Sequence, residues 1–329
     1  MGGVVVLALY FVYVNRGQLP EARQAAVHAS PGWLAVAAAL AVAMILNYGA
    51  LSRAAFRAVG VSLRYRRATL MTAAGHFLNT VIVNSGGMAG VTVFLREADR
   101  VGFARGKAMT GYLVVAQLGH FVFAGILVVA LIVAHADREV TRAEWLATGV
   151  FAFYTSLALA LLVAAVRSPG AVRFVHALPG RVRRRALTLA GRRPSPNPGE
   201  TAEADDLYAA LSTVIHKPRQ MALPAIHALG TEALGIGMLW ALLRAFGAGG
   251  GIEAPLFAYA MGVLFSIVGF LPAGAGFAEA GLGLALVSSG VAGPVAALVV
   301  VSYRVLETWI PVAYGAWAAQ HVFRLRGQR

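Results

Sequence analysis

The chain has 329 residues, of which 59% are hydrophobic and 13% are charged, and it contains no cysteine. About a quarter of the residues in a typical soluble domain are charged, so this composition excludes that class. The missing cysteines exclude disulfides and thiolate-based zinc sites. The net charge of +14 is dispersed over polar segments between apolar ones. That distribution is typical of membrane-protein loops and not of a nucleic-acid-binding surface.

The apolar segments predict membrane-spanning helices, each of which needs about 20 residues to cross the hydrocarbon core. The first segment, residues 2–14, is shorter and has neither a basic leader nor a small-residue cleavage site. We interpret it as a first membrane helix and not as a removed signal peptide. The other predicted spans are residues 31–51, 109–134, 145–166, 221–246 and 294–320.

Two further apolar stretches are interrupted by glycine and polar residues. The first break, residues 79–87, contains four polar side chains before two glycines, and the second, residues 271–279, runs through a proline and two glycines to Glu279. Irregular backbone at membrane depth has to be buried in protein or to line a cavity, because lipid cannot satisfy free N–H and C=O groups. Two such breaks in matching places of two halves are typical of a transporter's binding site.

Basic residues decide between two membrane layouts. If residues 71–95 crossed the membrane, residues 53–67 with five Lys or Arg and residues 167–219 with ten would lie on opposite sides, against the positive-inside rule. If residues 71–95 instead enter, turn at residues 84–87 and return, both basic segments lie inside. The four basic residues of 96–107 then lie inside as well. The second layout is therefore the prediction.

A second hairpin, residues 255–290, entering from the outside, places the three basic residues near the C-terminus inside too and leaves four basic residues outside. The sequence thus predicts an all-α polytopic membrane protein. It would have about six full spans and two re-entrant helical hairpins of opposite orientation, related as an inverted repeat.

We assign one integral membrane domain over residues 1–329. Its first half covers residues 31–166, a cytoplasmic basic loop covers 167–219, and the second half covers 220–320. We expect a multi-pass protein of the plasma membrane with both termini in the cytoplasm. The arginines of the basic loop are expected to act as orientation signals and to contact anionic lipid.

Ionisable side chains inside a membrane cost about 2.5–3.5 kcal/mol at the helix centre, so each requires a reason. Glu279 is expected in the first turn of the helix after the second break, where free N–H groups favour negative charge. It either caps that helix or lines a cavity and meets a headgroup. Arg304 and Glu307 are three residues apart on one helix and therefore share a face. They form a structural pair, or Arg304 contacts a lipid phosphate.

The remaining candidates are polar residues in or beside the apolar segments. Glu232 lies in the middle of its span without an evident partner, and it either neutralises Arg304 or titrates in a proton-coupled cycle. Asn79 and Asn84 are suited to satisfying backbone groups at the first break. Tyr303, next to Arg304, either packs in the core or contacts the headgroup. Three further polar residues are expected near the first break: His76, Gln117 and His120. The histidine spacing predicts no metal site, and we expect no cofactor.

The second break and the last span are similar to a known family. The run from Phe270 to Glu279 resembles the Pro–(Gly-rich)–Gly–x–x–Glu segment of the lysylphosphatidylglycerol synthase-type transmembrane family, also called the flippase-like domain. The last span, with Tyr303–Arg304, Pro311 and Gly315, resembles the family's closing Tyr–Arg helix. Asn79 with the glycines that follow it resembles the family's first half.

This resemblance implies a domain that moves an aminoacylated lipid between leaflets. It also implies that Glu279 and Arg304 act at the substrate-binding site. Relatives of the multiple peptide resistance factor join the domain to a soluble aminoacyltransferase. The sequence shows no such segment after its last span, so we do not carry the synthase name over. We expect a chain that is not an enzyme, with a lipid-modifying enzyme as the alternative.

Three functions are compatible with these residues. The first is a translocator for a phospholipid, such as aminoacylated phosphatidylglycerol, or for a polyprenyl-linked sugar. The second is an integral-membrane enzyme that modifies a lipid headgroup with Glu279 or Glu232 as general base. The third is a scaffold that docks a separate synthase through residues 167–219. The expected partners are anionic or aminoacylated membrane lipids, a separate synthase and a second copy of the chain, with no nucleic acid.

Overall fold

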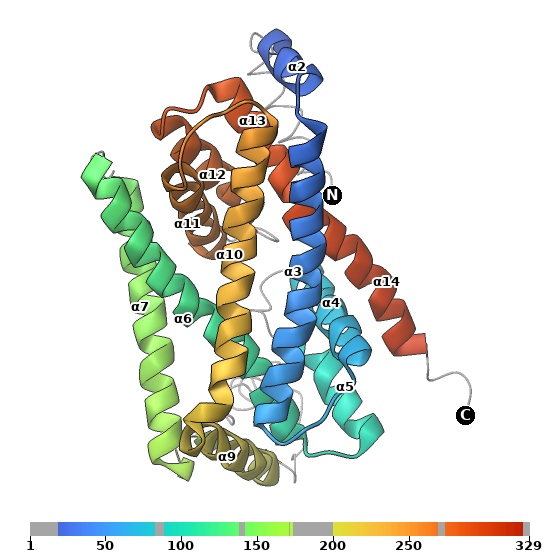
Figure 1. Ribbon diagram of the computed structural model, residues 1–329. Coiled ribbons are helices and arrows are strands. Elements are labelled where there is room, and N and C mark those ends of the chain that lie inside the picture. The colour runs from blue at the N-terminus through green and yellow to red at the C-terminus, as the bar shows by residue number, and fades with distance from the viewer. Residues whose placement is uncertain are drawn as a thin grey trace, which may run out of the picture.

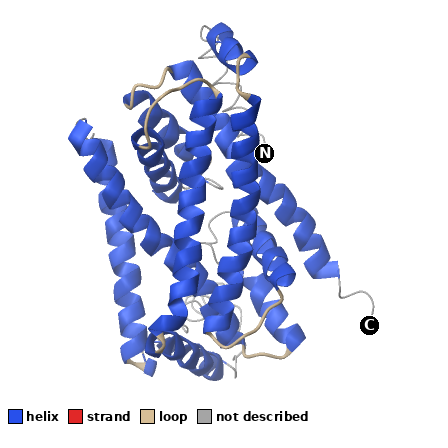
Figure 2. Cartoon of the chain, in the orientation of Figure 1, coloured by secondary structure: helices blue, strands red, loops and turns tan. Residues whose placement is uncertain are grey.

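The computed structural model describes residues 19–82, 89–137, 142–170, 172–173, 200–268 and 274–324. Every regular element in these residues is a helix (Figures 1 and 2), which confirms the all-α prediction for this part of the chain. The first predicted span, the arginine-rich part of the basic loop and the tips of both predicted hairpins lie outside the described residues.

The described helices in chain order are α2 (Leu19–Val27), α3 (Pro31–Ala58), α4 (Tyr65–Val81), α5 (Val91–Val101), α6 (Arg105–Asp137), α7 (Arg142–Arg167), α9 (Glu200–His216), the 3₁₀-helix η2 (Pro218–Met221), α10 (Ala222–Ala245), α11 (Glu253–Val268), α12 (Phe277–Ser288), α13 (Gly293–Arg304), the π-helix η4 (Val305–Trp309) and α14 (Ile310–Arg324).

Four stretches of the described chain are long and apolar enough to cross a membrane. Their mean hydropathies are 2.1, 2.3, 1.4 and 1.5, for Pro31–Ala58, Arg105–Val133, Pro218–Ala245 and Gly293–Phe323 respectively. Each overlaps one of the predicted spans, and α7 covers the predicted span at residues 145–166. The chain is therefore a multi-pass membrane protein.

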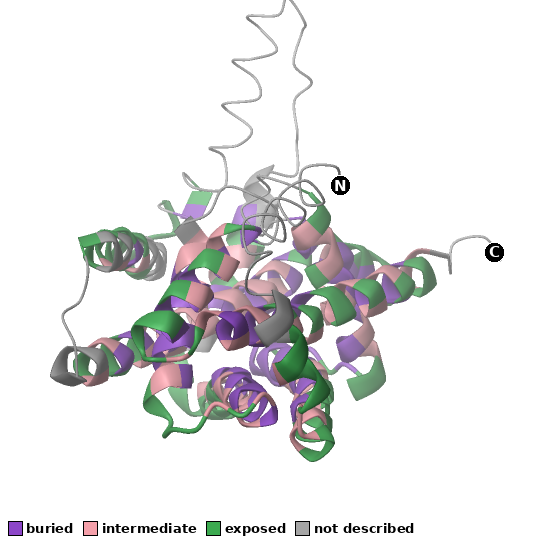
Figure 3. Ribbon diagram, turned by 90° about the horizontal axis from the view of Figure 1, so that it is seen from above, coloured by how far each residue is buried: buried purple, intermediate pink, exposed green. Residues whose placement is uncertain are grey.

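The four stretches differ in how much protein surrounds them. Half of the most apolar window in the α10 stretch is buried inside the protein, against 17% of that in the α6 stretch. Large apolar side chains such as Ile132 on α6 and Phe153 on α7 are exposed, and Figure 3 shows exposed residues on the outer faces of the helices. Helix α10 is thus central, and the exposed apolar faces are suited to contact with lipid tails.

Helices α3 and α10 lie side by side along the length of the bundle (Figure 1). A polar cluster joins them at mid-height: the Asn47 amide donates to the His227 carbonyl at 2.7 Å and to the Thr231 hydroxyl at 2.9 Å. The side-chain oxygen Oδ1 of Asn47 accepts a hydrogen bond from Nδ1 of His227 at 2.7 Å. Because polar groups away from water need partners, this cluster fixes the register of the two helices.

Two pairs of shorter helices pack at opposite ends of the bundle. Helices α4 and α5 lie toward the end that holds α9, whereas α11 and α12 lie toward the other end (Figure 1). Glycines permit the close approach of α11 and α12, since a Cβ at Gly262 would lie 2.5 Å from Leu282 and one at Gly281 would lie 2.8 Å from the Met261 carbonyl. Small residues at such contacts are typical of helix packing in membranes.

A charged cluster ties the start of α4 to the end of α5. The buried Glu97 carboxylate accepts two hydrogen bonds from Arg67, at 2.9 and 2.6 Å, and two from Arg100, both at 3.1 Å. Burial works to raise the pKa of Glu97, but the hydrogen bonds from both arginines outweigh it and hold the pKa below its usual value. The cluster therefore holds the start of α4 against the end of α5.

Helix α9 is an element that the sequence analysis did not predict within the basic loop. Acidic residues at its start suit a helix N-terminus, and Ala204, Ala210 and Leu211 are buried. The helix packs against the start of α6, where Gly106 leaves room for the backbone at Asp206. The part of the loop next to the second half is therefore structured.

Candidate functional site

Three charged side chains meet where α12 approaches the last span. Arg304 ends α13, and its Nε donates to Oε1 of Glu279 at 2.8 Å while its Nη1 donates to Oε2 of Glu307 at 3.2 Å. The arginine side chain is 8% exposed and the two carboxylates are 33% and 31% exposed. We call Glu279, Arg304 and Glu307 the ion triad. Two carboxylates against one guanidinium leave it with an excess of negative charge.

Glu279 also caps helix α12. Its Oε2 accepts the backbone N–H of Gly276 at 2.7 Å, while its other oxygen binds Arg304. Gly276 has φ 84°, a conformation that glycine adopts without strain. The capping role expected from the sequence is confirmed. The alternative, that Glu279 lines a cavity and meets a headgroup, stays a prediction, and Glu279 is not among the described wall residues of the cavity beside the triad.

The last span changes helix type at the triad. Residues Val305–Trp309 form a π-helical turn, in which the Ile310 N–H bonds to the Val305 carbonyl five residues earlier. Glu307 lies inside this turn and accepts a hydrogen bond from the Thr308 hydroxyl. Single π-turns within α-helices are rare and are frequent at functional sites. The sequence analysis predicted a helix here but not this turn.

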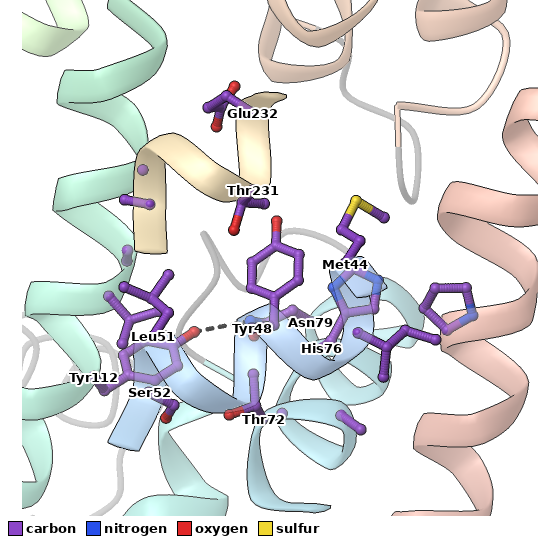
Figure 4. Close-up of a pocket in the computed structure, with 18 of the residues that line it drawn as sticks. Met44, Tyr48, Leu51, Ser52, Thr72, His76, Asn79, Tyr112, Thr231 and Glu232 are labelled. Atoms are coloured by element: carbon purple, nitrogen blue, oxygen red, sulfur yellow. Dashed lines mark hydrogen bonds between the residues drawn. The ribbon is translucent and has the colours of Figure 1, made fainter. Parts of the chain in front are cut away.

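A cavity of about 350 Å³ lies beside the triad at the middle of the spans. Its wall includes Tyr48, His120, Glu232 and Glu307, which stand near the midpoints of the four membrane-crossing stretches. Figure 4 shows the labelled side chains from α3, α4, α6 and α10 gathered around it. Glu307 belongs to both the wall and the triad. We call this space the central cavity.

The surface of the central cavity is mostly apolar, but polar side chains from several helices contribute to its wall. Its polar residues are Tyr48, Ser52, Thr69, Thr72, His76, Asn79, Tyr112, His120, Thr231, Glu232, Glu307 and Tyr314. Two of these side chains are carboxylates, and neither lysine nor arginine is among the described residues of the wall. Glu307 is already paired with Arg304, so Glu232 and the aromatic rings are the groups of this wall that favour a positively charged or hydroxyl-rich ligand.

Glu232 occupies the α10 side of this wall and is 8% exposed. Its Oε2 accepts the Tyr259 hydroxyl of α11 at 2.8 Å. The ring of Tyr259 reaches this position because Gly235 has no side chain: a Cβ there would lie 2.5 Å from the ring. The described partner of Glu232 is thus a tyrosine hydroxyl and not Arg304.

Asn79 holds the first helix pair together at the opposite wall. Its Oδ1 accepts the backbone N–H of Gly90 at 2.6 Å, and its Nδ2 donates to the Tyr112 hydroxyl at 2.8 Å. The expectation that Asn79 satisfies a backbone group at the first break is confirmed. Asn84 lies outside the described residues.

Comparison with known families decides the classification. The family model described as "Lysylphosphatidylglycerol synthase TM region" matches residues 1–315. The chain belongs to this family. The resemblance seen in the sequence is thereby confirmed over almost the whole chain. A search of curated proteins gives no match. The family description connects the chain with a membrane role in the handling of lysylphosphatidylglycerol.

In this lysylphosphatidylglycerol synthase-type membrane domain, the predicted site residues fall into three groups. Glu279, Arg304 and Glu307 form one cluster, and Glu307 with Glu232 and Asn79 lines the central cavity. Tyr303 is buried in the hydrophobic core and is not among the described wall residues. The predicted neighbours His76 and His120 do line the cavity.

Several wall residues were not predicted from the sequence, of which Tyr48, Tyr112 and Thr231 are the clearest examples. Their sequence signal was a polar side chain in the interior of an apolar span, the same signal that singled out Glu232. Threonine is common in such spans and tyrosine is common at their ends, so the signal alone was weak. Within the described residues, no group of three or more His, Asp or Glu is placed to hold a metal ion.

Proposed function

We propose that this chain translocates a phospholipid between leaflets, and that the headgroup passes through the central cavity while the acyl chains stay in lipid. The observation that carries the proposal is a carboxylate-bearing polar cavity at the midpoint of four apolar spans. Carboxylates at that depth are costly and commonly mark the path of a polar substrate. In this proposal the chain is a translocator and not an enzyme.

The charge of the wall supports an aminoacylated phosphatidylglycerol as the cargo. Glu232 and the ion triad together place three carboxylates and one guanidinium in the wall of the central cavity or beside it. Lysylphosphatidylglycerol carries two ammonium groups against one phosphate, so its headgroup complements this charge, whereas plain phosphatidylglycerol does not. A separate synthase then supplies the aminoacylated lipid.

Access from both leaflets follows if the two short helix pairs are re-entrant hairpins. Their helices have 17, 11, 16 and 12 residues, which at 1.5 Å per residue reach about 16–26 Å, less than the roughly 30 Å of hydrocarbon. Because the α4–α5 pair and the α11–α12 pair lie at opposite ends of the bundle (Figure 1), each would open to one side. The two halves would then form an inverted repeat with both termini cytoplasmic, in the plasma membrane.

Cysteine labelling tests this layout directly, since the chain has no cysteine of its own. In intact cells, Gly249→Cys should react with an impermeant maleimide and Ser195→Cys should react only after permeabilisation. Labelling of Ser195→Cys from outside would contradict the layout.

Leaflet exchange in proteoliposomes tests the function. We expect wild type to move fluorescent lysylphosphatidylglycerol faster than phosphatidylglycerol, and Glu232→Gln and Glu307→Gln to abolish that preference. Asp99→Asn, an exposed carboxylate on α5 outside the cavity, is the matched control and should behave as wild type. Absence of exchange by folded wild type for both lipids would reject the proposal.

A further inference from the structure

A second cavity, of about 540 Å³, opens at one end of the bundle, where α10 and α12 end and α11 and α13 begin. Its wall includes the glycine-rich segment 247–251, two serines at the end of α12 and apolar residues of α6, α11 and α13. This end is opposite the one that holds α9 and the Arg67–Glu97–Arg100 cluster (Figure 1). We call it the end cavity. It shares no wall residue with the central cavity.

Arg244 is held in the wall of the end cavity by two contacts. Its Nη2 donates to the Gly250 carbonyl at 2.8 Å, and its guanidinium carbon lies 5.3 Å from the centroid of the Trp240 ring. Trp240 is itself fixed by an edge-on contact with Trp33, with ring centroids 5.2 Å apart. Stacking on an aromatic ring orients the planar guanidinium and leaves its other edge for a ligand.

Glu253, in the first turn of α11, brings the opposite charge to the same wall. Among the described residues, neither Arg244 nor Glu253 has a charged partner within ion-pair distance. Arg304 and Glu97, by contrast, each have two partners of opposite charge. The end cavity therefore holds one positive and one negative side chain that do not form an ion pair with each other.

A ligand that satisfies both must carry an anionic and a cationic group. Guanidinium binds phosphate oxygens with paired hydrogen bonds, and a carboxylate binds ammonium. Apolar wall residues such as Val133, Phe257 and Val295 suit the glycerol and first acyl carbons of a lipid. Tryptophan beside an arginine is typical of the membrane–water interface.

We propose that the end cavity binds the headgroup of a phospholipid that carries both a phosphate and an ammonium group, with Arg244 on the phosphate and Glu253 on the ammonium. The site is separate from the central cavity, so its occupation does not depend on translocation. If translocation also takes place, the end cavity is where the headgroup docks on that side of the membrane.

Equilibrium binding to the purified, detergent-solubilised chain tests this assignment without any transport step. The probes are short-chain dihexanoylphosphatidylethanolamine, dihexanoylphosphatidylglycerol without the ammonium, glycerophosphoethanolamine without acyl chains, and inorganic phosphate. We expect the phosphatidylethanolamine to bind most tightly, and Arg244→Gln to weaken both lipids by about tenfold, the loss of one charge-assisted contact. Glu253→Gln should weaken only the phosphatidylethanolamine and so remove the preference between the two lipids.

Arg142→Gln, an exposed arginine at the start of α7 outside the cavity, is the control and should bind as wild type. Thermal unfolding of each variant establishes that it is folded. Equal binding of phosphatidylethanolamine by wild type and Arg244→Gln would overturn the proposal, and so would a preference that survives Glu253→Gln. Binding of glycerophosphoethanolamine as tight as that of the lipid would overturn the assignment to a lipid. None of these results depends on leaflet exchange, so failure here is distinct from failure of the proposed translocation.

Discussion

Among single substitutions in the ion triad, we expect the removal of Arg304 to lower the stability of the fold most. The guanidinium is 8% exposed and bonds Glu279 at 2.8 Å and Glu307 at 3.2 Å. Arg304→Gln leaves two carboxylates without their cation, and removing one partner of a buried pair costs about 3–5 kcal/mol. Glu279→Gln or Glu307→Gln leaves Arg304 paired with the other carboxylate. Because each carboxylate is also about one-third exposed, we expect a cost of about 1 kcal/mol for either.

Unfolding in mixed micelles, followed by the loss of helical signal, measures these free energies. The informative comparison adds the variant in which all three positions are glutamine. It removes the unpaired charges and leaves three amides that can hydrogen-bond to one another. We therefore expect it to recover most of the stability lost in Arg304→Gln, since the main cost of that variant is the uncompensated charge. If Arg304→Gln costs no more than either single glutamate variant, the triad does not hold α12 to the last span and the reasoning fails.

Two further predictions concern other parts of the fold. Gly235→Ala should lower the free energy of unfolding by about 1–3 kcal/mol, because the new methyl group pushes the Tyr259 ring away from Glu232. Gly237→Ala is the control and should be near neutral, since its Cβ would meet its nearest neighbour at 3.6 Å. Equal losses for the two variants in the same unfolding assay would count against the Tyr259 contact. Because the pKa of Glu97 is held below its usual 4.5, its ionised form stabilises the fold above about pH 4.5 and this contribution is lost as the pH falls through the lower folded-state value. The thermal midpoint of wild type should therefore fall between about pH 7 and about pH 4 more than that of Arg67→Gln, and parallel curves would refute this.

The helical class and four of the spans were predictable because they depend on apolar length, which is local in the sequence. The pairing of Arg304 with Glu307 was predictable for a similar reason, since residues three apart share a helix face. The approach of Glu279 to this pair was not derivable from spacing, because it depends on how α12 packs against the last span. The resemblance to the family indicated both residues without indicating their contact.

Other features depend on tertiary packing or on backbone hydrogen bonds that no local pattern encodes. The π-turn at Val305–Trp309 has a composition that suits an ordinary helix. The bonds from Arg67 and Arg100 to Glu97 join segments that the sequence analysis treated only as sources of positive charge. Helix α9 formed within a segment assigned to a loop, because buried alanines and a leucine give it a face to pack.

The central claim, that a lipid headgroup enters the central cavity, is tested most directly by photo-crosslinking. A lysylphosphatidylglycerol with a photoreactive group on its lysyl moiety would be incubated with the chain in liposomes, irradiated, and the modified residues located by mass spectrometry. We expect adducts on the cavity segments of α3, α4 and α10 around Tyr48, His76 and Thr231. Excess unlabelled lipid and the Glu232→Gln substitution should each reduce them. Adducts confined to the outer faces of α6 and α7, unaffected by competitor, would contradict it.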